Sequence, residues 1–278
     1  MASERGTTNN TEKFEKYRPK KFLGQNFLVD ENIARKIVAS LDIQPDDYVV
    51  EIGPGQSSLT KYITELTKNF IAVELDKHIV AKLREENKFE VIHKDFLKID
   101  FDADFAKFGD KSKPIKIIGN IPYNITSQIL FKLFDNSQRV KSAILMMQKE
   151  VARRLTAVPN TKDYGILAIQ TQVFTNPKLL FNVPPTAFFP KPKVDSTVVK
   201  FDFIQQKNPV ENYPLFKTLV KESFGQRRKT MRNSLKKFFE ERSLKFEDFN
   251  FDFKRRAETV SIDEYIEFSS QINKTISK

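Results

Sequence analysis

Nine consecutive residues, Ile115–Tyr123, place an amide and an aromatic ring directly after a largely apolar run. The β-branched stretch Ile115–Ile118 is typical of a buried strand, and α/β sheets hold their ligands just beyond such strand ends. Asn120 can accept a hydrogen bond from an amino group, while Pro122 has no N–H and Tyr123 offers a stacking face. The stretch therefore predicts a site for a flat base with an exocyclic amine. An ordinary strand-to-helix turn is the alternative.

A glycine-rich turn follows an earlier predicted strand, residues 47–52. Its glycines, Gly53 and Gly55, would let the backbone approach a nucleotide-like ligand closely. The dinucleotide fingerprint requires a third glycine, and Ser58 stands there instead. Glu51, two residues before the first glycine, favours a ligand with a cationic end. The pattern indicates a nucleotide-like ligand other than a dinucleotide, although a purely structural turn has similar residues.

Two further predicted strands also end next to an acidic residue. Glu74 ends the next strand, about 20 residues after Gly53, where α/β nucleotide sites hold ribose hydroxyls. Asp95 comes just past the following strand and can accept from an adenine amino group while Phe96 packs on the base. Each acid alone is more typical of a solvated loop. With Glu51 included, three successive strand ends around one glycine turn carry an acid, and this favours a shared adenosine-like pocket.

The composition excludes several kinds of chemistry. The 278 residues contain no cysteine and two histidines. A thiolate nucleophile, cysteine-ligated zinc, an iron–sulfur cluster and a three-histidine metal site are therefore excluded. The net charge of +11 favours a nucleic-acid partner over a merely solubilising surface. No apolar run is long enough for a membrane span, and the first residues lack a secretory signal. We expect a cytoplasmic protein without a metal.

The pattern changes along the chain. Residues 1–12 are polar and predict a disordered tail, whereas residues 13–204 alternate predicted strands and helices, which indicates an α/β domain. Residues 205–278 begin with a polar linker and continue with helical periodicity, including a Ser261–Glu264 capping box, so we expect a small all-α domain. Its segment 225–237 contains six Lys or Arg and no acid. This predicts an RNA-binding face, with a solvated face as the alternative; its residues are Arg227, Arg228, Lys229, Arg232 and Lys236.

Two loops complete the predicted site. The proline-rich segment 183–196 is rigid, and we expect it to present Phe188 as a ring that stacks on the base opposite Tyr123. A core phenylalanine is the alternative. Near the amino terminus, residues 22–28 mix apolar anchors with amides and a glycine, which indicates a loop folded over a ligand. Basic residues precede this loop: Lys13, Lys16, Arg18, Lys20 and Lys21.

Together these stretches resemble the ribosomal RNA adenine dimethyltransferases, and in particular the kasugamycin-sensitivity methyltransferase family of the small ribosomal subunit. The resemblance covers about residues 20–272 and includes motifs at 24–28, 51–55, 120–123, 188–196 and 224–230. The last motif and residues 256–258 favour the small-subunit enzymes over their antibiotic-resistance relatives. The chain departs from the family at Ser57, where a further glycine is frequent, at Ile121, usually leucine, and at Lys191, usually proline.

The resemblance implies a class I methyltransferase fold: a Rossmann-like, mixed and mostly parallel sheet with helices on both faces, plus the small helical domain. It implies S-adenosylmethionine as methyl donor, no metal, and a donor pocket made of Asn26, Leu28, Gly53, Gly55, Glu74, Asp95, Phe96 and Asn120. It places Asn120, Ile121, Pro122, Tyr123 and Phe188 at the acceptor base. The implied reaction, by a monomer, dimethylates two adjacent adenosines in the 3′-terminal hairpin loop of 16S RNA in immature small subunits. A role in subunit biogenesis accompanies it.

Three other functions remain open. A nicotinamide-dependent oxidoreductase would share the strand, turn and Glu74, but it leaves residues 120–123 and the charge unexplained. A non-catalytic RNA-binding assembly factor on the same fold is harder to exclude. A 23S RNA adenine dimethyltransferase of the antibiotic-resistance type is the nearest alternative.

Overall fold

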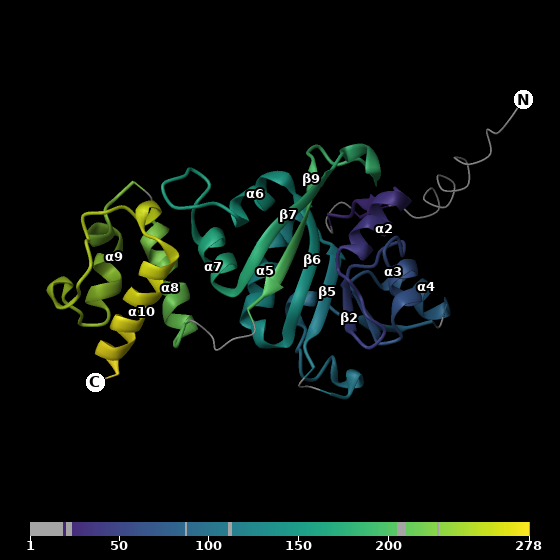
Figure 1. Ribbon diagram of the computed structural model, residues 1–278, viewed down its shortest axis with the longest axis horizontal. Helices are drawn as coiled ribbons and strands as arrows, with labels where there is room; N and C mark the ends of the chain where they lie inside the picture. Colours follow the sequence, from purple (N-terminus) through teal and green to yellow (C-terminus); the bar gives the residue numbers. More distant parts are fainter. Residues whose placement is uncertain are drawn as a thin grey trace, which may run out of the picture. The chain divides into compact units, whose positions relative to one another are not determined.

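The computed structural model describes residues 19–20, 24–86, 88–110, 113–204, 210–226 and 228–277 (Figure 1). These residues form two compact units. The first contains the chain up to residue 152 and residues 178–203, and the second contains residues 153–177 and those from 204 onward. The predicted tail at 1–12 and most of the predicted linker lie outside the described residues. Residues 153–177 were expected in the α/β domain, but they pack with the helical unit, where Tyr164 donates to the Val260 carbonyl (2.9 Å).

A seven-stranded sheet forms the first unit, in the order β4-β3-β2-β5-β6-β9-β7. The first five of these strands pair in parallel, and β9 pairs antiparallel with β6. The sheet is therefore mixed and mostly parallel, which confirms the predicted fold class. The strands are β2 Tyr48–Ile52, β3 Phe70–Glu74, β4 Glu90–His93, β5 Ile115–Asn120, β6 Val140–Gln148, β7 Thr175–Val183 and β9 Ser196–Phe203.

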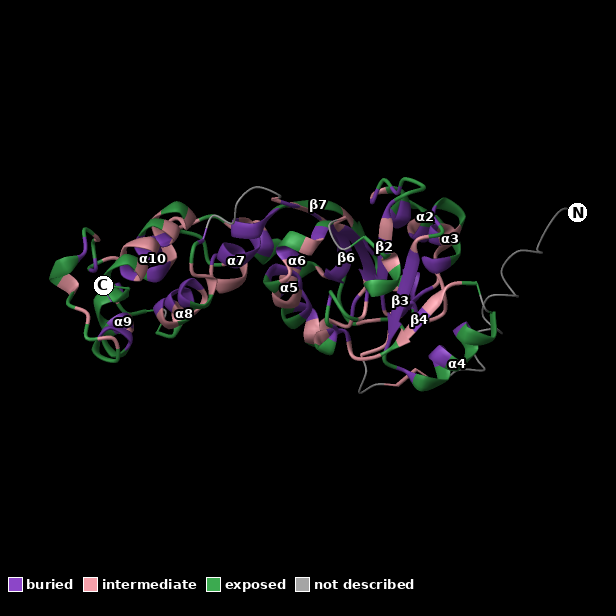
Figure 2. Cartoon of the chain, turned by 90° about the horizontal axis from the view of Figure 1, so that it is seen from below, coloured by how far each residue is buried: buried purple, intermediate pink, exposed green. Residues whose placement is uncertain are grey.

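Helices cover the sheet and account for its apolar strands. Buried residues follow the strands, and exposed ones lie on the outer faces of helices such as α4 (Figure 2). Strand β3 is buried throughout, as expected for parallel strands covered on both faces. Asp30 caps α2 by accepting from the Ile33 N–H (3.0 Å), and the helix turns Ala34, Ile37 and Val38 inward. The helices are α2 Glu31–Ala39, α3 Thr60–Leu66, α4 Lys77–Glu86, α5 Thr126–Asp135 and α6 Lys149–Leu155.

The strand order reverses between β2 and β5, and this positions the site. The chain runs outward from β2 through β3 to β4, then returns to place β5 on the other side of β2. Open α/β sheets bind ligands at such a switch point, beyond the carboxyl ends of the strands. Gly119 pairs with Ile52 here, and a Cβ at Gly119 would lie 2.8 Å from the Ile52 carbonyl oxygen. Glycine is therefore the residue that lets the two strands run side by side up to the site.

The second unit is helical and its core is aromatic. Its helices are α7 Ile166–Phe174, α8 Tyr213–Phe224, α9 Met231–Glu240 and α10 Ile262–Ile276. Phe239 of α9 stacks on Phe246 with ring centroids 4.1 Å apart and also contacts Phe268 of α10. The predicted capping box is present, since Ser261 Oγ accepts from the Glu264 N–H and Glu264 accepts from the Ser261 N–H.

A buried ion pair joins the start of β2 to β5. Lys116 is 5% exposed, and its Nζ lies 2.7 Å from Asp47 Oδ2 and 3.2 Å from the Leu41 carbonyl oxygen. Burial raises the pKa of the Asp47 carboxyl, but hydrogen bonds from Lys116 and the Gln44 N–H outweigh it and hold that pKa below its ordinary value. The pair therefore stabilises the fold above the ordinary pKa of the carboxyl, and this contribution is lost as the pH falls.

Removing one partner of this pair should be costly. Asp47→Ala leaves the Lys116 ammonium buried without its carboxylate, so we expect the free energy of unfolding to fall by about 3–5 kcal/mol. Urea denaturation at pH 7 measures it. Asp46→Ala, at an exposed neighbouring position, should stay within about 0.5 kcal/mol of the parent. Similar losses in the two variants would contradict the assignment.

Candidate functional site

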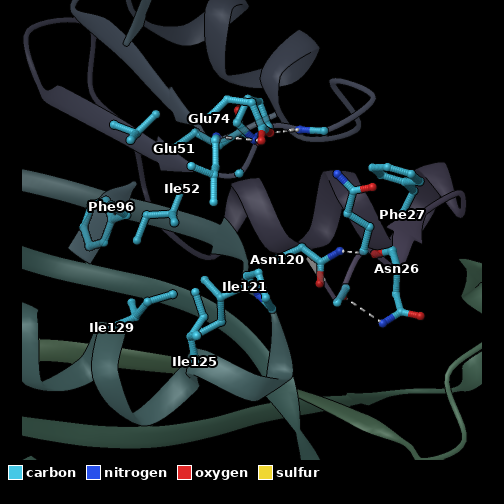
Figure 3. A pocket seen from close by; sticks show the side chains of 18 of the residues that line it. Asn26, Phe27, Glu51, Ile52, Glu74, Phe96, Asn120, Ile121, Ile125 and Ile129 are labelled. Carbon is cyan, nitrogen blue, oxygen red and sulfur yellow. Dashed lines mark hydrogen bonds between the residues drawn. The ribbon is translucent and has the colours of Figure 1, made fainter. Parts of the chain in front are cut away.

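One cavity of about 250 Å³ lies at the carboxyl ends of β2, β3 and β5 (Figure 3). The segment before β1 (Phe27–Leu28) and the short helices η2 (Phe96–Lys98) and η4 (Tyr123–Ile125) complete its wall. The structure brings together here the residues predicted at separate points of the sequence. Those lining the cavity are Asn26, Leu28, Gly53, Gly55, Glu74, Asp95, Phe96, Asn120, Ile121, Pro122 and Tyr123.

The Glu74 carboxylate is held by backbone N–H groups at the end of β3. Its Oε1 accepts from Leu75 and Asp76, both at 2.8 Å, and its Oε2 accepts from Gly55 at 3.3 Å. Burial raises the pKa of Glu74. Gly55 has φ +53°, and a Cβ there would lie 2.9 Å from the Phe27 ring, so only glycine fits. The carboxylate therefore has a fixed orientation at the cavity wall.

Glu51 lies beside Glu74 and is 1% exposed (Figure 3). Thr60 Oγ1 donates to its Oε2 at 2.7 Å. Burial raises the pKa of Glu51 to about 8, with the Glu74 charge adding to the rise and the Thr60 hydrogen bond opposing it. The carboxyl is consequently largely protonated at neutral pH. A cation entering the cavity would favour its ionised form.

Asn120 ends β5 and turns its amide toward the cavity. Its Nδ2 donates to the Asn26 carbonyl oxygen at 2.8 Å, which assigns the amide and leaves Oδ1 pointing away from Asn26 (Figure 3). The Asn26 side chain in turn donates to the Gly24 carbonyl at 3.3 Å. An oriented acceptor therefore lies at the cavity.

Tyr123 and Asp95 are positioned by short 3₁₀ turns. The Tyr123 hydroxyl lies 2.6 Å from Ser196 Oγ, so the ring is fixed from both ends. Burial raises the pKa of Tyr123, which keeps the phenol neutral. Asp95 caps η2 by accepting from the Leu97 N–H at 2.9 Å, and Phe96 beside it is 5% exposed. An aromatic face and an acceptor thus flank the cavity at separate points.

Comparison with known proteins identifies the family. A family model described as ribosomal RNA adenine dimethylase matches residues 16–274. The chain belongs to this family. Membership makes the protein a methyltransferase that acts on adenine in ribosomal RNA.

Relatives agree with this assignment, and solved structures agree with the fold. A protein named ribosomal RNA small subunit methyltransferase A from Alkaliphilus metalliredigens is 42% identical over 268 residues, or 92% of this chain and 93% of that protein. Its namesake from Prosthecochloris aestuarii is 45% identical over 255 residues, or 91% and 94%. A dimethyladenosine transferase structure from Plasmodium falciparum (24% identity, 89% of this chain and 98% of that one, TM-score 0.72) supports the fold. The structure of the 23S rRNA methyltransferase ErmE also supports the fold (22% identity, 89% of this chain and 100% of that one, TM-score 0.61).

The position of Phe188 corrects one prediction. Phe188 in β8 (Phe188–Phe189) pairs with Leu28, is 2% exposed, and packs in the hydrophobic core of the sheet unit. It does not line the cavity. The expectation of a presented ring is wrong because β8 pairs with β1 and turns this side chain inward. Phe189, the next residue along the strand, is 40% exposed.

The basic segment of the helical unit is less uniform than its sequence indicates. Arg228, Lys229, Arg232 and Lys236 are exposed, and Arg227 lies outside the described residues. The fold brings acids from elsewhere: Arg232 pairs with Glu247 at 3.1 Å, and Lys236 lies 3.9 Å from Glu240. No helix within the described ranges is long and apolar enough to cross a membrane.

The sequence analysis missed three residues that hold the site. Thr60 and Ser196 supply the hydroxyls that bond Glu51 and Tyr123, and Asp76 is a buried carboxylate beside Glu74. The sequence marks Ser196 only as the last residue of the 188–196 motif. Thr60 begins α3 and Asp76 directly precedes α4, where such residues are common caps, and Ser196 begins β9, so their sequence positions carried no separate signal.

Phe188 and Phe189 offer a matched pair of substitutions. Because Phe188 is a core residue, Phe188→Ala should lower the free energy of unfolding by about 3–5 kcal/mol. Phe189→Ala removes a much more exposed ring and should cost about 1 kcal/mol or less. Urea denaturation of both variants tests this. A larger loss for Phe189→Ala would mean that the two side chains exchange places in solution.

The pKa of Glu51 predicts a pH-dependent stability. Folded Glu51 keeps a proton that the unfolded chain releases near pH 4.5, so its contribution is complete below that pH and is lost as the pH rises to about 8. The expected slope is about 1.4 kcal/mol per pH unit in that window. Glu51→Gln preserves an acceptor for Thr60 and should flatten the slope. Unfolding free energies of parent and variant at pH 5, 6, 7 and 8 measure it, and parallel curves would contradict it.

Proposed function

We propose that the protein transfers methyl groups from S-adenosylmethionine to two adjacent adenosines in the 3′-terminal hairpin loop of 16S RNA. Its substrate would be the immature small ribosomal subunit, and it would act there as a monomeric cytoplasmic factor in subunit biogenesis. Family membership and relatives named for the small subunit, 42% and 45% identical, support the substrate class. The observation that carries the proposal is the oriented Asn120 acceptor beside Tyr123, at the same cavity as Glu74 and Asp95.

The cavity fits the donor by its chemistry. S-adenosylmethionine has a ribose, an adenine and a cationic end, and when bound it supplies an activated methyl group. Glu74 offers carboxylate oxygens for ribose hydroxyls, and Asp95 with Phe96 offers an acceptor and a ring for adenine. Glu51 offers a carboxyl for the cationic end, and its ionised form would be favoured there. Gly53, at positive φ and with nothing within 4 Å of where a Cβ would be, leaves the backbone open to close approach.

The acceptor base requires hydrogen-bond acceptors, since its amine lone pair is delocalised into the ring. Asn120 Oδ1 and a backbone carbonyl next to Pro122 would accept the two amine hydrogens and direct the lone pair. Tyr123, fixed by Ser196, would stack on a base splayed out of its loop. Catalysis is then mostly positioning, which can supply roughly 7–11 kcal/mol when the reacting atoms are aligned. The proton leaves after the nitrogen–carbon bond forms, so no general base is required.

A direct test separates the proposal from its alternatives. The protein is incubated with radiolabelled S-adenosylmethionine and isolated immature small or large subunits, and the labelled base is mapped. Label on two adjacent adenosines of the small-subunit hairpin supports the proposal. Label on large-subunit RNA favours the antibiotic-resistance type, and binding without label favours a non-catalytic assembly factor.

The stacking role of Tyr123 predicts a specific loss. Stacking is worth roughly 1–3 kcal/mol per base, so Tyr123→Ala should slow methyl transfer about 5- to 150-fold while donor affinity stays unchanged. Tyr123→Phe keeps the ring and loses only the hydrogen bond to Ser196, so its loss should be smaller. Single-turnover transfer rates and calorimetric donor titration measure both quantities. A wild-type rate for Tyr123→Ala would remove Tyr123 from the acceptor site.

The exposed cations predict a change in salt dependence. If Arg228 and Lys229 contact phosphates, changing both to Ala should flatten the slope of log affinity against log salt by about 1.4–1.8. Arg232 and Lys236 have acidic neighbours, so their double Ala variant should flatten the slope less. Subunit binding across a salt series tests the two variants. Parallel plots for the parent and the Arg228/Lys229 variant would assign these residues to a solvated face.

A further inference from the structure

A buried carboxylate with no assigned role, that of Asp76, lies two residues beyond Glu74. Its side chain is 0% exposed. Lys20 Nζ lies 2.9 Å from its Oδ1 and 2.8 Å from its Oδ2, and Gln25 Nε2 donates to Oδ2 at 3.3 Å. The His78 N–H donates to Oδ1 at 3.0 Å. One carboxylate thus binds two side chains that come from the amino-terminal part of the chain.

These two partners are joined to each other and to the cavity. The Lys20 N–H donates to Gln25 Oε1 at 2.8 Å, so the ammonium, the amide and the carboxylate form a closed set of bonds. Gln25 lines the cavity together with Gly24 and Asn26. The Asn26 carbonyl then accepts from Asn120 at 2.8 Å. The cavity wall at 24–26 is therefore fixed to Asp76 on one side and to Asn120 on the other.

Asp76 also touches the opposite wall. Its backbone N–H donates to Glu74 Oε1 at 2.8 Å. The same residue thus orients the carboxylate proposed for the ribose and anchors the segment that faces it. Lys20 is one of the basic residues that precede the loop at 22–28, and its ammonium is used within the protein.

We propose that Asp76 is a positioning residue for the methyl donor, which holds the wall at Gly24–Asn26 in place through Lys20 and Gln25. The inference rests on the proposed function, since it names the ligand of the same cavity. Stability alone is a weak reason for such a pair, because a buried ion pair replaced by apolar residues often leaves stability unchanged. The pair matters because of where its partners lie. Breaking the Lys20–Asp76 pair would release the cavity wall at Gly24–Asn26.

The expected effect is on donor retention. Asp76→Asn keeps the shape and an acceptor, but it loses the charge that binds Lys20. Loss of a charge-assisted bond of this kind changes an equilibrium constant by a factor of about 10 or more. Because the Lys20–Asp76 bond holds the cavity wall, we expect its loss to raise the dissociation rate of the ligand about tenfold. The rate of the transfer step at saturating donor should change little, while the donor KM rises.

The experiment measures binding without catalysis. The probe is S-adenosylhomocysteine, and its affinity and dissociation rate are measured for the parent, Asp76→Asn, Lys20→Ala, the double variant and Lys20→Arg. We expect both single variants to bind more weakly, the double variant to bind no more weakly than either, and Lys20→Arg to recover most of the loss. Glu31→Gln is the control, because it breaks the exposed Lys61–Glu31 pair (2.6 Å) of the same unit and should bind as the parent does.

The outcomes separate this inference from the proposed function. A parent that does not bind S-adenosylhomocysteine overturns the donor site itself. A parent that binds, with Lys20→Ala and Asp76→Asn binding equally well, overturns the positioning role alone, as do fully additive losses in the double variant. Melting temperatures are recorded for every protein. If Asp76→Asn does not fold, Lys20→Ala and Lys20→Arg decide the matter, since Lys20 is 29% exposed and carries the partner charge.

Discussion

The site depends on how closely β2 and β5 run together at the switch point. A Cβ at Gly119 would lie 2.8 Å from the Ile52 carbonyl oxygen, so a larger residue would push the strands apart. The two strands lead directly into the glycine turn at 53–55 and into Asn120. Their separation therefore sets the distance between the parts of the cavity that are proposed to hold the donor and the acceptor base. Gly119 has no functional atom of its own, yet the chemistry depends on it.

Much of the fold could be predicted because parallel strands covered by helices have an unambiguous pattern. The strands at 48–52, 70–74 and 115–120 are short, apolar and followed by turn residues, and the polar residues at their ends stand out against them. The carboxyl ends of parallel strands meet at one edge of a sheet, so Glu51, Glu74 and Asn120 could be grouped without coordinates. The boundary between the domains was not predicted, since residues 153–177 were assigned to the α/β domain and belong to the helical unit.

The rest depended on pairings that a linear pattern does not contain. Phe188 and Phe189 are adjacent phenylalanines, and only the pairing of β8 with β1 decides which one is buried. The acids that meet Arg232 and Lys236 come from residues 240 and 247, beyond the basic segment itself. The partnership of Lys20 with Asp76 spans the amino-terminal segment and the end of β3. Apart from the Lys236–Glu240 pair, which joins successive turns of α9, these are long-range contacts, and residue type alone left more than one partner open.

The acid-rich wall of the cavity has a consequence for turnover. The proposed dimethylation of two adenosines requires four transfers, so the spent donor would have to leave repeatedly. The proposed donor carries a sulfonium charge that Glu51 and Glu74 would attract, whereas the spent molecule has lost that charge along with its methyl group and keeps only its ammonium as a cation. Its departure also lets Glu51 take up a proton again, because burial favours the neutral carboxyl. The cavity would thus distinguish fresh from spent donor by charge, and methyl transfer would itself lower the affinity of the cavity for the spent donor.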